Sequence, residues 1–138
     1  SVIPRMKEKK FGRIVNITSA MVKNPHLIMG LSTSARSGLH GLSKALSREV
    51  AQFNITINNL LPERIDTDRQ TQMLNLQAKI TGTSYEESRK ALEETLSAKR
   101  MGTAEEFSGI CTFLCSQQAA YISGQNISVD GGNSTNLI

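Results

Sequence analysis

Three side chains are expected to lie at one end of a predicted β-sheet. Residues 12–18 (GRIVNIT) form a short, β-branched and mostly apolar run, which is typical of a buried strand in a parallel sheet, and Ser19 follows it directly. Ser32 and Arg36 are four residues apart in a predicted helix, so they share one face of its first turns. Ligands of open α/β sheets bind at the carboxyl ends of the strands. The two hydroxyls and the guanidinium are therefore candidate ligand-binding groups.

The helix that carries Ser32 and Arg36 is predicted from hydrophobic periodicity. Asn24 and Pro25 interrupt the chain after the first strand, and the helix is predicted over residues 31–53. Its apolar residues recur at steps of mostly three and four: Leu39, Leu42, Leu46, Val50 and Phe53. This pattern indicates a long amphipathic helix with charged residues mostly off the apolar stripe.

Two further strands are predicted, over residues 55–61 and 125–129, which gives three strands in all. Between them, residues 69–100 are polar and long enough for two helices, and another helix is expected over 104–116. Capping-box patterns begin two of these helices: Ser84 with Glu87, and Thr103 with Glu106. The order of elements predicts an α/β fold with helices flanking a parallel sheet.

Several segments resemble the short-chain dehydrogenase/reductase family, most closely its 3-oxoacyl-acyl-carrier-protein reductase-like branch. GRIVNITS at residues 12–19 resembles the strand that ends in the family's catalytic serine, and SGLHGLSKAL at 37–46 resembles the helix after its Tyr-x-x-x-Lys motif. The closing segments also match: RMGTAEE at 100–106, YISGQ at 121–125 and VDGG at 129–132. The resemblance covers essentially the whole chain, but it corresponds to the second half of a usual family member.

The resemblance implies the C-terminal half of a Rossmann-like, doubly wound parallel sheet. Residues 1–138 would form a single partial domain, with a helical lid over about 67–99. The family's glycine-rich phosphate loop belongs to the missing half, so one sheet edge is expected to be unpaired and to need that half or a partner. Candidates for the pocket-facing side of the lid are Met73, Leu74, Leu76 and Ile80, of which at least two are expected to pack against the core.

The catalytic tyrosine and lysine of the family are replaced in this chain. Thirteen positions after Ser19, the usual separation, stands Ser32, and four further on stands Arg36, so Tyr-x-x-x-Lys becomes Ser-x-x-x-Arg. In the family mechanism the phenol exchanges a proton with the substrate oxygen, while the lysine lowers the phenol pKa and holds the ribose. A serine hydroxyl is shorter and far less acidic, and a planar guanidinium differs from an ammonium in geometry. We therefore expect catalysis by the usual route to be lost, and this chain alone to be inactive.

The resemblance also implies a nicotinamide cofactor, NAD or NADP, with the choice left open. Its contacts would come from Arg36, Pro62, Ile65 and Thr67, of which Arg36 would hold the ribose and Thr67 the carboxamide and diphosphate. A helix N-cap is the alternative role for Thr67. Glu63 replaces a usual glycine, and this substitution adds bulk and an anion near the expected cofactor position.

Two functions from different classes remain open. The first is an NAD(P)-dependent oxidoreductase that acts on a carbonyl or alcohol, such as a 3-oxoacyl thioester. In it, Ser19 would position the substrate oxygen, Arg36 would hold the ribose, and Ser32 or a bound water would relay the proton. The second is a catalytically impaired protein that binds cofactor or oligomerises. Family members usually form dimers or tetramers, so a homo-oligomer is expected in either case.

The composition argues against nucleic-acid-binding, metal-binding and membrane-spanning proteins. The net charge is +4 and the pI is about 9.3, but the cations are scattered without interleaved aromatic residues, which favours a solvated basic surface over nucleic-acid binding. The histidines and cysteines lack ligand spacing, so no metal site is expected, and Cys111 and Cys115 are interpreted as packing residues. Two cysteines without a signal peptide predict a cytoplasmic setting, and no apolar run is long enough to span a membrane.

Overall fold

A single parallel sheet organises the computed structural model, which describes residues 2–137. Its strands are β1 (Gly12–Ile17), β2 (Ile55–Pro62) and β3 (Asn126–Val129), and β2 lies between the other two. Gly12 pairs with Ile55, and the register continues to Ile17 opposite Leu60. Because all strands are parallel, their carboxyl ends meet at one edge. The predicted class and number of strands are confirmed, with strand ends that differ by one residue.

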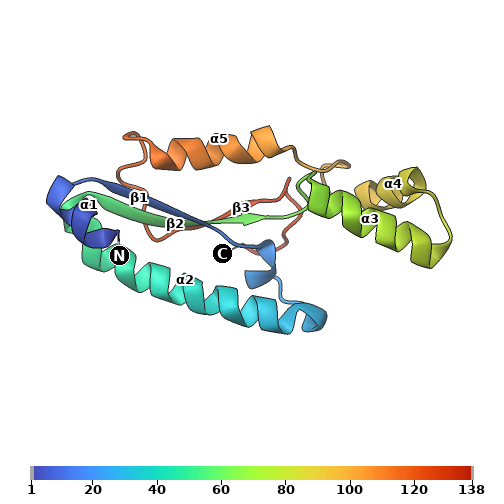
Figure 1. Ribbon diagram of the computed structural model, residues 1–138, viewed down its shortest axis with the longest axis horizontal. Coiled ribbons are helices and arrows are strands. Elements are labelled where there is room, and N and C mark those ends of the chain that lie inside the picture. Colours follow the sequence, from blue (N-terminus) through green and yellow to red (C-terminus); the bar gives the residue numbers. More distant parts are fainter. Residues whose placement is uncertain (1, 138) are drawn as a thin grey trace.

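Helices cover both faces of this sheet (Figure 1). The long helix α2 (Gly30–Val50), continued by a 3₁₀ turn over Ala51–Phe53, lies along one face, and α5 (Ala104–Cys115) lies across the other. The two helices expected between residues 69 and 100 are α3 (Asp68–Thr81) and α4 (Tyr85–Thr95). They form a helical hairpin that projects beyond the carboxyl edge of the sheet. The short helix α1 (Ile3–Lys9) precedes β1.

The core divides into separate clusters because the central strand is buried on both faces. On the α2 face, Val50, Ile55 and Ile57 pack together. On the α5 face, the fully buried residues are Leu60, Leu114 and Ala119. A third cluster lies at the base of the helical hairpin: Leu74, Leu96 and Met101, with Tyr85 and Leu92 against it. Among the described residues, no helix is both long and apolar enough to cross a membrane.

Helix α2 turns a largely polar face to the sheet, which differs from the expected apolar stripe. Leu39 and Leu42 of that stripe are 38% and 57% exposed. The residues that are buried instead are Thr33, His40, Ser43, Ser47 and Val50. One reason is that β1 presents an amide here, since Asn16 Nδ2 donates to Ser43 Oγ at 3.0 Å. The small serine side chains also let α2 approach the sheet closely.

A row of asparagine side chains crosses the three strands beneath α2. Asn16, Asn59 and Asn126 lie directly opposite one another in the strand register. Asn16 Nδ2 donates to Asn59 Oδ1 at 2.9 Å, and Asn59 Nδ2 donates to Asn126 Oδ1 at 2.7 Å. The row starts at Ser43 of α2 and ends at the exposed Asn126, so every amide in it has a partner.

Both predicted capping boxes are present. At the start of α4, Glu87 N–H donates to Ser84 Oγ at 3.1 Å, and Ser84 N–H donates back to the Glu87 carboxylate at 2.8 Å. The start of α5 repeats the arrangement with Thr103 and Glu106 at the same two distances. Each box satisfies backbone donors that a helix N-terminus leaves without partners, which fixes where these helices begin.

Candidate functional site

The hydroxyl of Ser19 lies at the carboxyl edge of the sheet, beside the end of β2. Thr18 N–H donates to the Leu60 carbonyl at 2.8 Å, so Ser19 stands at the level where β2 reaches Pro62. Ser19 also begins the 3₁₀ turn Ala20–Val22, and its Oγ accepts from Met21 N–H at 3.2 Å. Because a hydroxyl accepts and donates at once, this contact leaves the Ser19 O–H able to donate to a ligand oxygen.

Ser32 and Arg36 lie together on one face of α2, as their spacing predicts. The Arg36 guanidinium donates from Nη1 to Ser32 Oγ and, at 3.3 Å, to the Ser32 carbonyl. Both side chains are half-buried in the first turns of the helix. Since a guanidinium carries five N–H donors and both contacts use Nη1, its Nη2 and Nε remain for a ligand. The 3₁₀ turn that Ser19 begins contacts α2, so these groups belong to adjoining elements.

A buried histidine supports the residue that precedes Ser19, and sequence reasoning missed this role. His40 Nε2 and Thr18 Oγ1 are 2.8 Å apart, and Thr18 Oγ1 lies 3.3 Å from the Leu60 carbonyl. If Thr18 donates to Leu60, His40 must donate from Nε2, which leaves Nδ1 unprotonated. Within residues 2–137, Nδ1 has no hydrogen-bond partner. The available signal was spacing, because His40 follows Arg36 by one helical turn.

Protonation of His40 is expected to destabilise the fold as the pH falls. Burial, and then the charge of Lys23, lowers the pKa of His40 from its ordinary value of 6.5. The unfolded chain therefore takes up this proton at a higher pH than the folded chain, and stability is lost as the pH falls through 6.5. The melting temperature of the wild type should fall more between pH 7.5 and 5.5 than that of His40→Gln. Equal falls would contradict this role.

The predicted cofactor residues Pro62, Ile65 and Thr67 all lie where β2 ends and α3 begins. Pro62 is paired with Val129 of β3, and Ile65 forms an isolated parallel bridge with Gly102. Thr67 is the N-cap of α3, and its Oγ1 accepts from Gln70 N–H at 3.4 Å. The alternative role of Thr67 as an N-cap is therefore present, and the segment leads to a helix N-terminus, which favours anionic groups.

Glu63, whose carboxylate the sequence places near the expected cofactor position, contacts the C-terminal segment. Its Oε1 accepts from Asn133 Nδ2 at 2.9 Å. Glu63 lines a cavity of about 210 Å³ together with Arg64, Arg100 and Asp130. Asn133 also accepts from Ser97 N–H at 3.3 Å. The amide of Asn133 follows Glu63 by 70 residues, so this contact is not visible in local sequence.

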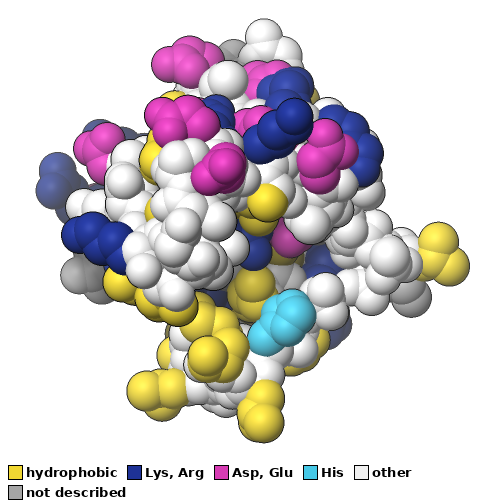
Figure 2. All heavy atoms as spheres, turned by 90° about the vertical axis from the view of Figure 1, so that its right-hand side faces the viewer, with side chains coloured by type: hydrophobic (Ala, Val, Ile, Leu, Met, Phe, Trp, Pro, Cys, Tyr) yellow, Lys and Arg dark blue, Asp and Glu magenta, His cyan; other side chains and the backbone are white. Residues whose placement is uncertain are grey.

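Exposed apolar side chains gather near the start of α2 and on the helical hairpin. Leu27 and Leu31 are 99% and 90% exposed, and both lie between Ser19 and Arg36 in the chain. The view of this end of the molecule shows hydrophobic side chains grouped on one part and charged ones on another (Figure 2). On α3 only Leu74 of the four candidates is buried; Met73, Leu76 and Ile80 are exposed. The expectation that at least two pack inward is wrong, because α3 buries only one narrow side.

The interpretation as packing residues fits Cys111 but is wrong for Cys115, which is exposed near the end of α5. Cys111 and Cys115 are both free thiols, and Cys111 packs against the α5 core cluster. Burial raises the pKa of the Cys111 thiol, which disfavours the reactive thiolate. Within residues 2–137, no group of three or more His, Cys, Asp or Glu side chains is arranged to hold a metal ion.

A parallel sheet with helices on both faces and polar groups at its carboxyl edge defines the Rossmann-like class of α/β proteins. The family model described as enoyl-(acyl carrier protein) reductase matches residues 1–134. The NADPH-dependent reductase BacG of Bacillus subtilis (strain 168) is 38% identical over 128 residues, covering 93% of this chain and 49% of that protein. The 3-oxoacyl-(acyl-carrier-protein) reductase FabG of Aquifex aeolicus (strain VF5) is 32% identical over 128 residues, covering 93% and 47%.

Solved structures agree with this assignment. The crystal structure of YwfH, titled as an NADPH-dependent reductase involved in bacilysin biosynthesis, matches with a TM-score of 0.87 and 36% identity over 96% of this chain and 50% of that one. The chain therefore belongs to the short-chain dehydrogenase/reductase family. It spans about half the length of the curated relatives it matches. The expected family and Rossmann-like fold are thus confirmed.

Proposed function

We propose that the protein carrying this chain is an NAD(P)-dependent oxidoreductase that acts on a carbonyl or alcohol. The observation that carries the proposal is the Ser19 hydroxyl at the carboxyl end of β1, at the start of a turn that contacts α2, the helix that holds Ser32 and Arg36. NADPH is the first cofactor to test, because the relative BacG is named as NADPH-dependent. The cofactor would supply the hydride.

In this proposal the residues of the site orient the substrate, bind the cofactor and transfer the proton. Ser19 donates a hydrogen bond to the substrate oxygen, and this bond strengthens as negative charge develops there. Arg36 holds the ribose through the N–H groups that Ser32 does not use. Ser32, or a water bound to it, relays the proton to the substrate oxygen. Pro62, Ile65 and Thr67 line the nicotinamide end of the cofactor site.

We further propose that residues 67–99, which contain α3 and α4, act as a lid over an apolar substrate. Support comes from exposed apolar residues near the start of α2 and on α3: Leu27, Ile28, Leu31, Met73, Leu76 and Ile80. Such a surface suits the hydrocarbon part of a 3-oxoacyl thioester or a similar ketone, because burial of apolar area favours binding. In this proposal residues 1–138 act as one partial Rossmann-like domain.

A homodimer or homotetramer is part of the proposal. Leu39 and Leu42 lie exposed on α2, and Gly38 and Gly41 beside them would let a second helix approach closely. Burial of these side chains against another copy would remove an apolar surface that a lone chain exposes to water. The two free thiols support a cytoplasmic setting for the assembly.

The test measures cofactor binding and turnover in the full-length protein. Binding of NADPH and NADH to the protein is measured by the fluorescence of the cofactors. Oxidation of the bound cofactor is then followed with a panel of carbonyl compounds that includes 3-oxoacyl thioesters and apolar ketones. We expect saturable binding of at least one cofactor and carbonyl-dependent oxidation. If neither cofactor binds, the oxidoreductase proposal fails.

A second candidate is a cofactor-binding protein without turnover, and the contact between Arg36 and Ser32 favours it. Ser32 stands at the position of the family's tyrosine, so no phenol is present there. Its hydroxyl oxygen already accepts a hydrogen bond from Arg36. Cofactor binding without reduction of any carbonyl would support this candidate. It would be supported further if Ser32→Tyr combined with Arg36→Lys produced activity. Wild-type turnover that survives Ser32→Ala would instead show that the proton comes from another group.

A further inference from the structure

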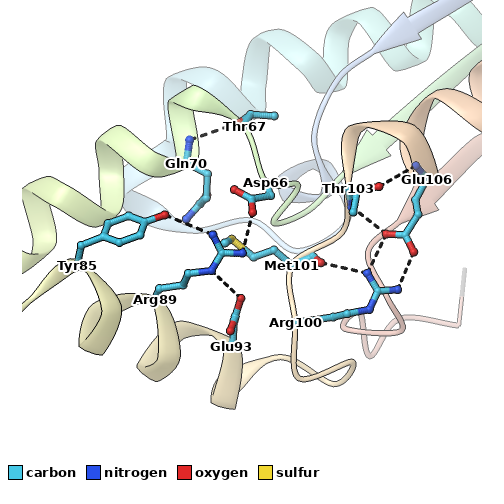
Figure 3. Close-up of polar contacts among 10 residues, drawn as sticks. All are labelled: Asp66, Thr67, Gln70, Tyr85, Arg89, Glu93, Arg100, Met101, Thr103 and Glu106. Carbon is cyan, nitrogen blue, oxygen red and sulfur yellow. Dashed lines mark hydrogen bonds and ion pairs between the residues drawn. The ribbon is translucent and has the colours of Figure 1, made fainter.

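Arg89 of α4 joins the helical hairpin to the segment that follows β2 (Figure 3). Its Nη2 lies 2.7 Å from Asp66 Oδ2, and its Nε lies 3.0 Å from Glu93 Oε1. Its Nη1 donates to the Tyr85 hydroxyl at 3.3 Å. Tyr85 and Glu93 belong to α4 itself, whereas Asp66 lies between Ile65 and Thr67. Of these three contacts, the one with Asp66 therefore connects α4 to another part of the chain.

The backbone around Asp66 is held by a second, independent set of contacts. Asp66 N–H donates to the Gly102 carbonyl at 2.8 Å, and Gly102 N–H donates to the Arg64 carbonyl at 3.1 Å. A Cβ at Gly102 would lie 3.0 Å from Ile65 Cδ1, so Ile65 packs closely against this glycine. Arg64 adopts a φ of 53°, which is unfavourable for a residue with a side chain. The segment is thus held in an unusual shape from two sides.

The ion pair between Arg89 and Asp66 fixes the orientation of the two side chains more than it stabilises the fold. The two side chains are 33% and 36% exposed, and pairs in such positions contribute little to stability. A guanidinium with three partners in fixed directions, however, has one orientation. The hydrogen bond to Tyr85, followed by that to Asp66, raises the pKa of Arg89, so the charge is retained at any working pH. Arg89 can therefore set the position of the Asp66 carboxylate.

We propose that Arg89 is a positioning residue that holds Ile65–Thr67 in the shape that receives the nicotinamide end of the cofactor. This inference rests on the proposed oxidoreductase function. The segment follows the carboxyl end of a parallel strand and leads into the N-terminus of the 14-residue helix α3, and both features favour a phosphate-bearing ligand there. Because Arg89 sits on α4, the hairpin and the cofactor site would move together.

The test compares the complete cofactor with a ligand that lacks the nicotinamide half, including its share of the diphosphate. The full-length wild type, Arg89→Gln and Asp66→Asn are titrated with NADPH and with adenosine 2′,5′-bisphosphate, or with NADH and AMP if the wild type binds NADH. Each variant should weaken binding of the complete cofactor by about 10-fold, a typical size for coupling between neighbouring sites. Binding of the shorter ligand should change by less than about 2-fold, and the double variant should be no weaker than either single one.

Glu93→Gln is the matched control, because it removes the charge of a partner within α4, keeps an amide oxygen that can accept from Arg89 Nε, and leaves the bond to Asp66. This control should bind both ligands as the wild type does. The proposal is overturned if Arg89→Gln leaves binding of the complete cofactor unchanged, if it weakens both ligands equally, or if Glu93→Gln has the same effect. Failure of the wild type to bind either complete cofactor would overturn the proposed function itself, and this is seen before any variant is compared.

Discussion

Replacement of Ser19 by alanine is expected to lower kcat with the best carbonyl substrate by about 10²-fold or more. A hydrogen-bond donor aimed at a developing oxyanion contributes this much because it acts at a preorganised position, where no reorientation is needed as the charge forms. The Ser19 hydroxyl is fixed in this way by the N–H of Met21 at 3.2 Å. The measurement is steady-state oxidation of the cofactor by the full-length protein.

Ser34→Ala is the matched control for Ser19→Ala, because Ser34 is an exposed serine on α2 near Ser32. It should keep the wild-type kcat. Cofactor affinity and melting temperature of Ser19→Ala should also stay close to those of the wild type, since Ser19 caps only a three-residue turn. If Ser19→Ala keeps more than half of the wild-type kcat, Ser19 does not position the substrate oxygen.

Leu114→Ala is expected to lower the free energy of unfolding by about 2–5 kcal/mol. Leu114 is fully buried in α5 and packs with Leu60 and Ala119 on the sheet face opposite α2. Truncation removes apolar contacts and leaves a cavity that a helix anchored by the Thr103 capping box cannot close easily. Since small domains are stable by only about 5–15 kcal/mol, this one change removes a large fraction of the total.

Urea denaturation of the full-length protein measures this loss, and Phe113→Ala serves as the control. Phe113 precedes Leu114 in the chain but is 41% exposed, so its truncation should cost clearly less. A loss below about 1 kcal/mol for Leu114→Ala, or equal losses for the two variants, would show that α5 does not pack on the sheet as described.

Contacts that are local in sequence could be predicted. Short apolar, β-branched runs predicted the strands, and a helical period predicted the long helix. The two capping boxes fixed where α4 and α5 begin, because their partners are three residues apart. The same holds for Ser32 and Arg36, whose contact follows from a spacing of four in a helix. Such interactions depend on one element and do not need knowledge of the rest of the fold.

Contacts between distant residues could not be predicted from local patterns. Thr18 and His40 are 22 residues apart, Asp66 and Arg89 are 23 apart, and Glu63 and Asn133 are 70 apart. Part of the buried face of α2 was missed for the same reason. Leu46 and Val50 of the predicted stripe do pack in the core, but Leu39 and Leu42 are exposed. Ser43 is buried instead and pairs with Asn16 of β1, a contact that hydrophobic periodicity cannot indicate.

The row of asparagines affects the register in which the strands of this sheet can pair. A slip of two residues between β1 and β2 would keep every apolar side chain on its present face, so hydrophobicity alone barely opposes it. Such a slip would place Asn16 opposite Ile57 or Leu61 instead of Asn59. Buried amides would then lose their partners, at a cost of about 1–3 kcal/mol each. The amide pairs therefore fix the register of the strands. They disfavour shifted registers that apolar burial alone would tolerate.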